Sequence, residues 1–245
     1  QADRILTNTE PARQALLSRY PEFSPEKVIT LTNGVDEEDY QDLQPTPLWK
    51  PSDRPVFVHA GSIYSKRDPS ALIKAFAKLK LSLPQYLPIL VFIGNWDEGL
   101  RRAIVETIAV SKLEDDVLLL PAMPRRSSLE ALLAADVLML IGDSEPSQLQ
   151  VPAKLFESLY LAKPILSLFQ VKSPVNYFLQ RYCPHFAQAH PSEVDEIECA
   201  LKNLSAQPWN ATESVASHVH SLSELSRRRQ AEQLNSILES LRILP

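Results

Sequence analysis

The chain has 245 residues, of which 44% are apolar and 22% charged, with a formal net charge of −5. A chain of this length and composition can bury a core of its own, and its acidic balance excludes non-specific nucleic-acid binding, which needs a basic surface. It has no apolar run long enough to span a bilayer and no secretory signal, so we expect a cytoplasmic protein. Its two cysteines, Cys183 and Cys199, fit neither a metal site nor a disulfide framework, and we expect free buried thiols.

Two short strands and a helix are predicted at the N-terminus. Residues 3–8 form the first strand, and Thr9 caps the helix that follows. Residues 27–32 form the second strand, which ends at the turn signal Asn33-Gly34. The polar, proline-rich residues 37–54 then predict a connecting loop.

A regular alternation of strands and helices begins at Pro55. Its strands are short apolar runs, as expected for strands that are covered on both faces, and each is followed by a helical pattern. Such a series predicts an α/β fold with a doubly wound, six-stranded parallel sheet of the Rossmann type. The predicted strands are Val56–Ala60, Ile89–Ile93, Val117–Leu120, Val137–Ile141, Ile165–Phe169 and His185–Ala189.

Helix-start signals separate these strands. They are Asp68 before Pro69, Asp97, a capping box of Ser127 with Glu130, Pro152, Ser173 with Pro174, and Ser192. A last, long helix is predicted from Asn210 and Glu213 to about Ile243. Its apolar stripe consists of Val215, Val219, Leu222, Leu225, Leu234, Ile237 and Leu241, and its run Arg227–Arg229 is expected to face solvent.

The helix that starts at Pro152 carries an unusual lysine. Lys154 in the first turn opposes the helix dipole, typically by about 0.3–1 kcal/mol, but it would stabilise a phosphate at that helix start. Glu157, three residues on, could accept hydrogen bonds from a sugar diol. The pair indicates a nucleotide-diphosphate site, and the alternative is an exposed Lys–Glu pair worth roughly 0.2–0.5 kcal/mol.

Four loops at the carboxyl ends of the strands would meet in one crevice near the switch point of the sheet. They are Gly61–Arg67, Gly94–Trp96, Pro121–Pro124 and Gly142–Ser147. Gly61 allows close approach to its backbone, and Arg67 can bind phosphate through two hydrogen bonds. The alternatives are a surface arginine for Arg67, a packing residue for Trp96, a bare turn for Pro121–Pro124 and a plain surface loop for Gly142–Ser147. His59, on a strand, is expected to be a core histidine.

Several segments together resemble the C-terminal domain of retaining, nucleotide-sugar-dependent glycosyltransferases of family 4, which have the GT-B fold. The resemblance covers most of the chain. It is carried by residues 2–7, by Lys27–Ile29 with Asn33-Gly34-Val35-Asp36, by Ala60–Tyr64 with Arg67-Asp68-Pro69, by Ala134–Val137, and by Val151–Glu157 with Lys163-Pro164-Ile165.

The resemblance implies the site residues. Arg67 and Lys154 would be the catalytic cations on the donor diphosphate, and Glu157 would bind the ribose hydroxyls. The other implied contacts of the nucleotide-sugar are Gly61, Ser62, Asn95, Met123 and Leu155. The donor would be a UDP- or GDP-sugar, with no metal ion required. Two positions depart from the family pattern: Ser62 replaces a basic residue that is common in the family, and Leu149 replaces a second glutamate.

The resemblance also implies the domain organisation. Residues 1–20 would be the last strand and helix of an N-terminal acceptor domain that this chain lacks, residues 21–208 the nucleotide-sugar domain, and residues 209–245 a helix that crosses back toward the acceptor domain. The function would be hexosyl transfer to a polysaccharide or glycolipid acceptor, with peripheral association at the inner face of the membrane allowed. The alternatives are a non-catalytic nucleotide-binding or protein-interaction domain of the same fold, a sugar-nucleotide epimerase, or a phosphorylase.

Overall fold

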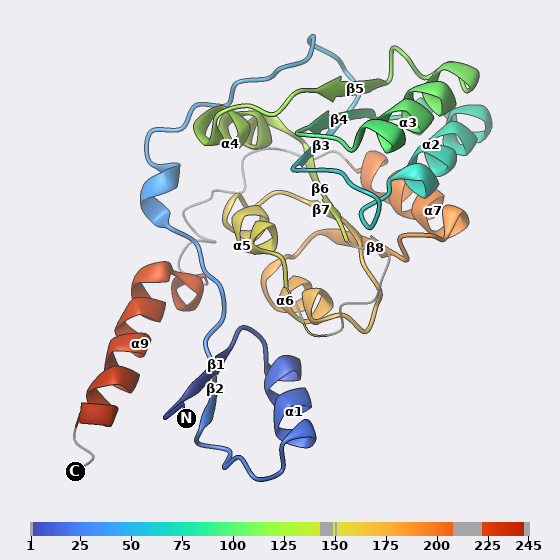
Figure 1. Ribbon diagram of the computed structural model, residues 1–245. Helices are drawn as coiled ribbons and strands as arrows, with labels where there is room; N and C mark the ends of the chain where they lie inside the picture. The colour runs from blue at the N-terminus through green and yellow to red at the C-terminus, as the bar shows by residue number, and fades with distance from the viewer. Residues whose placement is uncertain (1, 143–148, 150, 208–221, 243–245) are drawn as a thin grey trace.

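The computed structural model describes residues 2–142, 149, 151–207 and 222–242 (Figure 1). In this part of the chain the strands form two parallel sheets. The smaller sheet pairs β1 (Ile5–Thr7) with β2 (Val28–Thr30). The larger sheet has the strand order β5-β4-β3-β6-β7-β8. Its strands are β3 (Val56–Ala60), β4 (Ile89–Ile93), β5 (Val117–Leu120), β6 (Val137–Ile141), β7 (Ile165–Leu168) and β8 (Phe186–Ala189).

The strand order of the larger sheet determines where a ligand can bind. The chain first builds the sheet outward from β3 through β4 to β5, then crosses to the other side of β3 and continues with β6, β7 and β8. The switch point therefore lies between β3 and β6. In open parallel sheets, ligands bind beyond the carboxyl ends of the strands at such a point.

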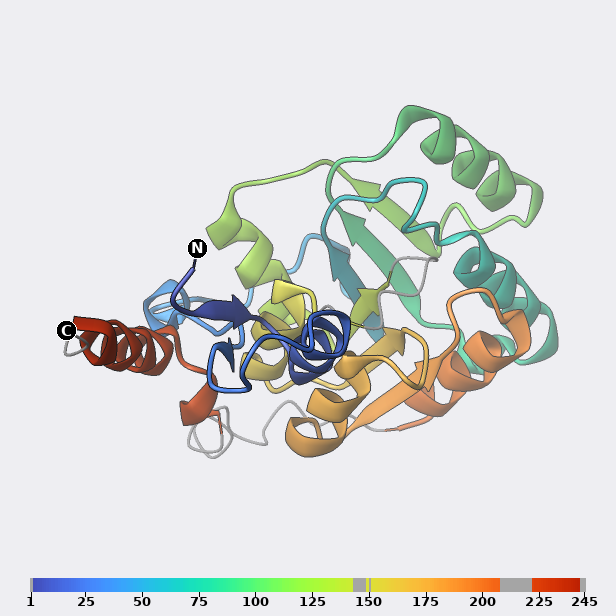
Figure 2. The same ribbon diagram turned by 60° about the horizontal axis from the view of Figure 1, so that its bottom comes forward.

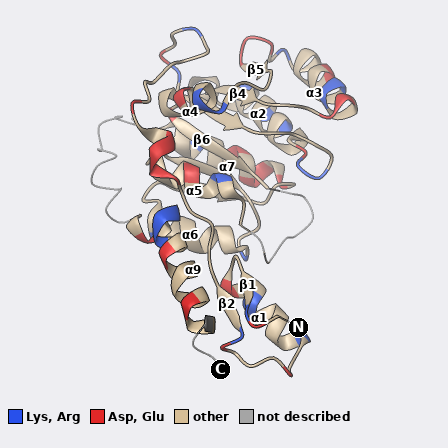
Figure 3. Ribbon diagram, turned by 60° about the vertical axis from the view of Figure 1, so that its left-hand side comes forward, with Lys and Arg blue, Asp and Glu red and all other residues tan. Residues whose placement is uncertain are grey.

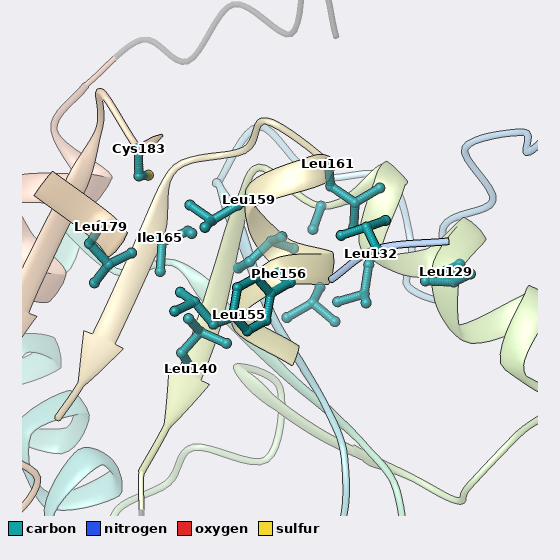
Figure 4. Close-up of a cluster of buried hydrophobic side chains, with 14 of the residues drawn as sticks. Leu129, Leu132, Leu140, Leu155, Phe156, Leu159, Leu161, Ile165, Leu179 and Cys183 are labelled. Carbon is teal, nitrogen blue, oxygen red and sulfur yellow. The ribbon is translucent and has the colours of Figure 1, made fainter. Parts of the chain in front are cut away.

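Helices cover both faces of this sheet (Figure 1). On one face, Phe57 and Phe92 pack among the apolar side chains of α2 (Ser70–Ser82), α3 (Glu98–Val110) and α7 (Val194–Ser205). On the other face, Val58 and Leu140 pack against α4 (Arg125–Ala134), α5 (Ala153–Tyr160) and α6 (Pro174–Tyr182), where Figure 4 shows Leu155 and Phe156 in the cluster. Adjacent strand residues thus enter opposite cores, which explains the uninterrupted apolar runs.

The structure confirms some predicted helix starts and shifts others. Pro69 and Pro152 precede the first helical residue instead of occupying it, and Ser192 comes one residue before the N-cap Glu193. The Thr9 side chain accepts a hydrogen bond from the Ala12 amide at 3.2 Å in α1 (Glu10–Arg19), and Asp97 caps α3 through the Leu100 amide at 3.0 Å. The capping box of Ser127 and Glu130 is wrong. Helix α4 begins at Arg125, three residues before the start that a cap at Ser127 implies; it follows Pro124 without a side-chain cap, and Glu130 forms an ion pair with Arg126 at 3.2 Å instead.

The N-terminal strands and α1 form a small unit beside the larger domain (Figures 1 and 2). The expected division after residue 20 separates two strands that the structure pairs, because β2 lies in register with β1 from Ile5–Val28 to Thr7–Thr30. The buried Thr9 hydroxyl donates a hydrogen bond to the Leu149 carbonyl, which ties this unit to the segment that precedes α5.

The C-terminal helix is shorter than the sequence predicts. The expected start at Asn210 and Glu213, with Val215 and Val219, lies outside the described residues. Beyond them, a 3-10 turn η3 (Ser223–Leu225) is separated by the extended Ser226 from α9 (Arg227–Arg242). Leu222 and Leu225 are buried in the main core, whereas Leu234, Ile237 and Leu241 are half-buried.

Backbone contacts hold the start of α9 against the segment that follows β2. The Val35 amide donates to the Leu225 carbonyl, and the Arg227 amide donates to the Val35 carbonyl, both at 2.8 Å. The Gln230 side chain donates to the Asn33 carbonyl, also at 2.8 Å. As expected, Arg227–Arg229 are exposed, and they give the start of α9 its positive charge (Figure 3).

Two aspartates strengthen the amino ends of the strands, opposite the switch-point edge. Asp116, only 4% exposed and just before β5, pairs with Arg54 and Lys80, each at 2.6 Å. Asp136, just before β6, accepts a hydrogen bond from the Val56 amide of β3 at 2.8 Å. Charged side chains thus fasten strand ends that are far from the candidate site.

Two further expectations can be compared with the structure. Cys183 is buried, as expected, but Cys199 is exposed, so the expectation of two buried thiols is wrong for Cys199. In the part of the chain that the structure describes, every helix is too short or too polar to cross a membrane.

Candidate functional site

A pocket of about 280 Å³ lies beyond the carboxyl ends of β3, β4 and β5, next to the switch point. We call it the site pocket. Three strand-to-helix loops and two helices, α4 and α5, form its wall. Its lining residues are Ala60, Gly61, Ser62, Ile93, Gly94, Asn95, Ala122, Met123, Arg125, Ser128, Leu129, Leu132, Lys154 and Glu157.

Gly61 and Lys154 meet at the centre of this wall. The Lys154 ammonium donates a hydrogen bond to the Ala60 carbonyl. A Cβ atom added to Gly61 would lie only 1.5 Å from Lys154 Nζ. The absence of a side chain at position 61 is therefore what lets the ammonium reach the end of β3. A cation and an open stretch of backbone share one corner of the pocket.

The environment of Lys154 disfavours the charged form of its side chain. Burial lowers its pKa to about 8, the nearby Arg67 guanidinium contributes in the same direction, and Glu157 opposes them. The ammonium would gain most from an anionic ligand, because such a ligand would replace hydration that burial has removed. This combination of a cleft, a desolvated cation and a shifted pKa is typical of functional sites.

Arg67 lies near the site pocket without lining it. Its Nη1 atom donates to the Ser62 carbonyl at 3.4 Å, and its guanidinium lies over the Tyr64 ring, 5.0 Å from the ring centre. Because Arg67 lowers the pKa of both Lys154 and His59, its positive charge acts on the same corner as Lys154. The positive charges of the two predicted cations are therefore close enough to interact.

Glu157 is held by an arginine that sequence reasoning missed. Arg125 Nη1 donates to Glu157 Oε1 at 2.8 Å, and Nη2 of the same guanidinium donates to Asp39 Oδ2 at 2.7 Å. Arg125 is the first residue of α4, and Asp39 belongs to the 3-10 turn η1 (Glu37–Tyr40). The carboxylate of Glu157 is thereby fixed on the wall of the pocket.

His59 is buried behind this wall, as expected of a core histidine. It is 2% exposed, and its Nδ1 atom lies 3.0 Å from the Met139 carbonyl. Since a carbonyl can only accept, Nδ1 carries the proton and Nε2 is an acceptor. Burial, together with the charges of Lys154 and Arg67, lowers the pKa of His59 to about 3, so the ring is neutral.

Comparison with known proteins gives no match to a family profile and none to a curated protein sequence. Solved structures do match. A glycosyltransferase from Rickettsia africae superposes with a TM-score of 0.74 at 14% identity, over 100% of this chain and 65% of that one. HepE from Anabaena, solved in complex with UDP-glucose, gives 0.71 at 16% identity, over 97% and 64%. Sucrose-phosphate synthase from Thermosynechococcus elongatus gives 0.70 at 16% identity, over 100% and 60%.

The chain has the fold of a glycosyltransferase domain. It matches the C-terminal-like domain of GT-B enzymes, and it spans about 60–65% of the length of these three structures. At 11–17% identity across the similar structures, the likeness shows the fold and leaves the chemistry to be argued from the residues.

Within this glycosyltransferase fold, six of the eight predicted site residues line the site pocket. They are Gly61, Ser62, Asn95, Met123, Lys154 and Glu157. Leu155 does not: its side chain is fully buried in the core beneath α5 (Figure 4). The Leu155 side chain points away from the pocket, and the predicted contact of this residue with the nucleotide-sugar stays a prediction.

Two other positions from the sequence analysis, Leu149 and Trp96, belong to the described part of the chain and do not line the pocket. Leu149 is an exposed turn residue, and residues 143–148, with Glu145, lie outside the described part of the chain. Trp96 packs edge-on against Phe92, with ring centres 5.5 Å apart, as expected of a packing residue. Across the described residues, no three His, Cys, Asp or Glu side chains are close enough together to hold a metal ion.

Proposed function

We propose that this chain is the donor-binding part of a hexosyltransferase of the GT-B type, and that the site pocket holds the diphosphate and ribose of a nucleotide-sugar. The observation that carries the proposal is the meeting of Gly61 and Lys154, which puts a desolvated ammonium beside an open backbone at the switch point of the sheet. The glycosyltransferase fold and the UDP-glucose complex of HepE support it.

Each residue has a role in this proposal. Lys154 and Arg67 attract the diphosphate, and by stabilising the charge that grows on it as the sugar leaves they lower the barrier. Gly61 and Ser62 give the phosphates access to the backbone. Glu157, fixed by Arg125, accepts hydrogen bonds from the ribose hydroxyls. Asn95 and Met123 lie on the walls that face the remainder of the nucleotide-sugar.

The proposal requires no metal ion, because two cationic side chains supply the positive charge at the diphosphate. UDP should therefore bind with the same affinity in the presence of EDTA as in the presence of Mg²⁺. A requirement for Mg²⁺ would mean that Lys154 and Arg67 do not suffice.

Titration calorimetry with UDP, GDP and their hexose conjugates tests the proposal directly. We expect saturable binding of one of these nucleotides, weakened by Lys154→Ala and by Glu157→Gln. Two exposed residues outside the pocket supply matched controls, Lys74→Ala on α2 and Glu106→Gln on α3, which should bind like the parent. Equal binding by the site and control variants would contradict the assignment of the site.

We further propose that the complete reaction is stereochemically retaining, belongs to glycosyltransferase family 4, and delivers the hexose to a polysaccharide or glycolipid acceptor that a further domain binds. The sequence motifs support this part. The chain alone should then bind the donor without transferring its sugar. Transfer by the chain alone would overturn the separation of roles, and an absence of any nucleotide binding would favour a non-catalytic interaction domain of the same fold.

A further inference from the structure

Two nitrogen atoms converge on Gly61. A Cβ atom added to this glycine would lie 1.5 Å from Lys154 Nζ and 3.3 Å from His59 Nε2. One atom is exposed to the site pocket from α5, and the other belongs to a buried ring on β3. Gly61 thus leaves the space in which the two side chains approach each other.

The buried nitrogen of His59 has an unused hydrogen-bonding capacity. Its Nδ1 atom donates to the Met139 carbonyl, whereas Nε2 is buried and makes no hydrogen bond to any described residue. A buried acceptor without a donor is unfavourable, so its presence in the fold calls for an explanation. The nearby ammonium of Lys154 has three N–H groups, and one of them donates a hydrogen bond to the Ala60 carbonyl.

We propose that His59 is a positioning residue, whose neutral imidazole accepts a hydrogen bond from the Lys154 ammonium at Nε2 and so holds the ammonium above Gly61, facing the site pocket. The Ala60 carbonyl and His59 Nε2 are then two fixed acceptors, and the third proton of the ammonium is directed toward a ligand. The hydrogen bond from His59 Nδ1 to the Met139 carbonyl supports this arrangement, because it keeps the proton on Nδ1 and the lone pair on Nε2.

The charges around the pair agree with these roles. Burial and the positive charges of Lys154 and Arg67 keep His59 neutral across the physiological range, with its pKa lowered to about 3. The same burial and Arg67 lower the pKa of Lys154 to about 8, while Glu157 raises it. A neutral acceptor can stabilise the ammonium without cancelling the charge that an anion would bind.

Lysine NMR tests the contact between the two nitrogens without any ligand. In a chain labelled with ¹³C at lysine Cε, the Lys154 signal is assigned by its loss in Lys154→Met, and its pKa is measured by titration. His59→Asn keeps a donor for Met139 but removes the nitrogen that faces Lys154. Loss of one acceptor should lower the pKa of Lys154 by about 0.5–1. His59→Gln, which restores an acceptor at the ε position, should recover most of that change.

A matched control and a second measurement separate positioning from stability. His190→Asn makes the same chemical change after β8, outside the site pocket, and should leave the Lys154 titration unchanged. A purely structural histidine would lower the melting temperature in both His59 variants and leave the pKa of Lys154 as in the parent, which would overturn the proposal. If His59→Asn does not fold, His59→Leu, which also removes the acceptor that faces Lys154, takes its place in the titration, and a parent-like pKa of Lys154 in that variant would overturn the proposal.

The consequence for ligand binding rests on the proposed function. At pH 8 we expect His59→Asn to bind UDP about two- to fivefold more weakly, in proportion to the loss of ammonium on Lys154. The two proposals fail separately. If the parent does not bind UDP, the proposed function is lost while the NMR result still judges the contact between His59 and Lys154.

Discussion

Arg125 Nη1 lies 2.8 Å from Glu157 Oε1, across the wall of the site pocket, and the same guanidinium reaches Asp39 at 2.7 Å. One arginine therefore connects three parts of the chain: the turn after β2, the start of α4 and the helix of Lys154. Both carboxylates accept from a single donor group, so Arg125 fixes their relative positions. Its side chain remains 51% exposed, which limits the energy of the network.

Arg125→Ala should lower the free energy of unfolding by less than about 1 kcal/mol, because ion pairs of exposed side chains are weak in water. Urea unfolding measures this change. Arg126→Ala, which removes the i,i+4 pair with Glu130 and a hydrogen bond to the Asp42 carbonyl, is the comparison. A loss well above 2 kcal/mol on Arg125→Ala alone would show that the three-residue network is a major support of the fold.

The ammonium of Lys154 should affect stability and ligand binding in opposite directions as the pH rises. Its pKa is lowered from 10.5 to about 8 in the folded chain, so between these values the unfolded chain carries more protons at this residue. Relative to Lys154→Met, the free energy of unfolding of the parent should rise from pH 8 to 10.5. Thermal or urea unfolding across this range gives the slope, and parallel curves for the two chains would contradict the buried ammonium.

Binding of UDP should weaken over the same pH range. A diphosphate interacts with the ammonium and not with the neutral amine, so the affinity of the parent should begin to fall near pH 8. Lys154→Met should bind more weakly throughout, by about 10- to 150-fold at neutral pH, as expected for a lost charged hydrogen bond. Calorimetry at several pH values checks both points, and a flat profile for the parent would argue against contact between Lys154 and the phosphates.

Arg67→Met should have two separable effects. Removing the guanidinium removes one of the two causes that lower the pKa of Lys154, so that pKa should rise above about 8 in the lysine NMR titration. If Arg67 also contacts the diphosphate, the affinity for UDP should fall about tenfold or more. Arg101→Met, an exposed change on α3, serves as the control. An unchanged titration of Lys154 would show that the two cations are not electrically coupled.

Two glycines of the pocket should respond differently to alanine. A Cβ at Gly61 would collide with the flexible end of Lys154, at 1.5 Å from Nζ, whereas a Cβ at Gly94 would lie 2.2 Å from the rigid Gly61 carbonyl oxygen. Both glycines have a positive φ, 158° and 153°, so alanine is strained at either position. Gly61→Ala should therefore weaken UDP binding with the smaller loss of stability, and Gly94→Ala should destabilise the fold more. Melting temperatures and UDP titrations of both variants distinguish the two cases, and equal loss of stability would contradict the argument.

Asp116 should matter for stability and not for the site. It is buried between Arg54 and Lys80, and Asp116→Asn would weaken two ion pairs at once. Because both cations can reach water, we expect a loss of about 1–3 kcal/mol in the free energy of unfolding, with unchanged UDP affinity. Asp115→Asn, at the exposed neighbouring position, should change neither quantity. A weaker affinity for UDP in Asp116→Asn would show that the two ends of the sheet are coupled.

The sheet could be predicted closely from the sequence because its strands have the clearest local signal. The apolar runs Val56–Ala60, Ile89–Ile93, Val117–Leu120 and Val137–Ile141 coincide with β3, β4, β5 and β6. A strand that is covered on both faces is apolar at every position, so its bounds can be read without deciding which residues face the core. The start of α4 differs from the prediction. Glu130 pairs with Arg126 instead of capping the helix, and the sequence around Glu130 allows both arrangements.

The site was predictable only as far as local residue chemistry reaches. Gly61, Lys154 and Glu157 follow from loop and helix-start patterns. Arg125 does not, since its partners are 32 and 86 residues away in the sequence. The apolar stripe around Leu222, Leu225 and Leu234 fits one helix by periodicity, yet Ser226 divides it, because the contacts with Val35 end one element and begin the next.

The aspartate contacts at the amino ends of the strands leave this protein with two ends of different character. Ion pairs and backbone contacts at Asp116 and Asp136 secure one end, while the opposite end consists of loops around Gly61, Gly94 and Lys154. Mutations that change ligand preference can accumulate at the loop end without loosening the anchored one. A scaffold divided in this way offers a starting point for engineering the residues of the site pocket.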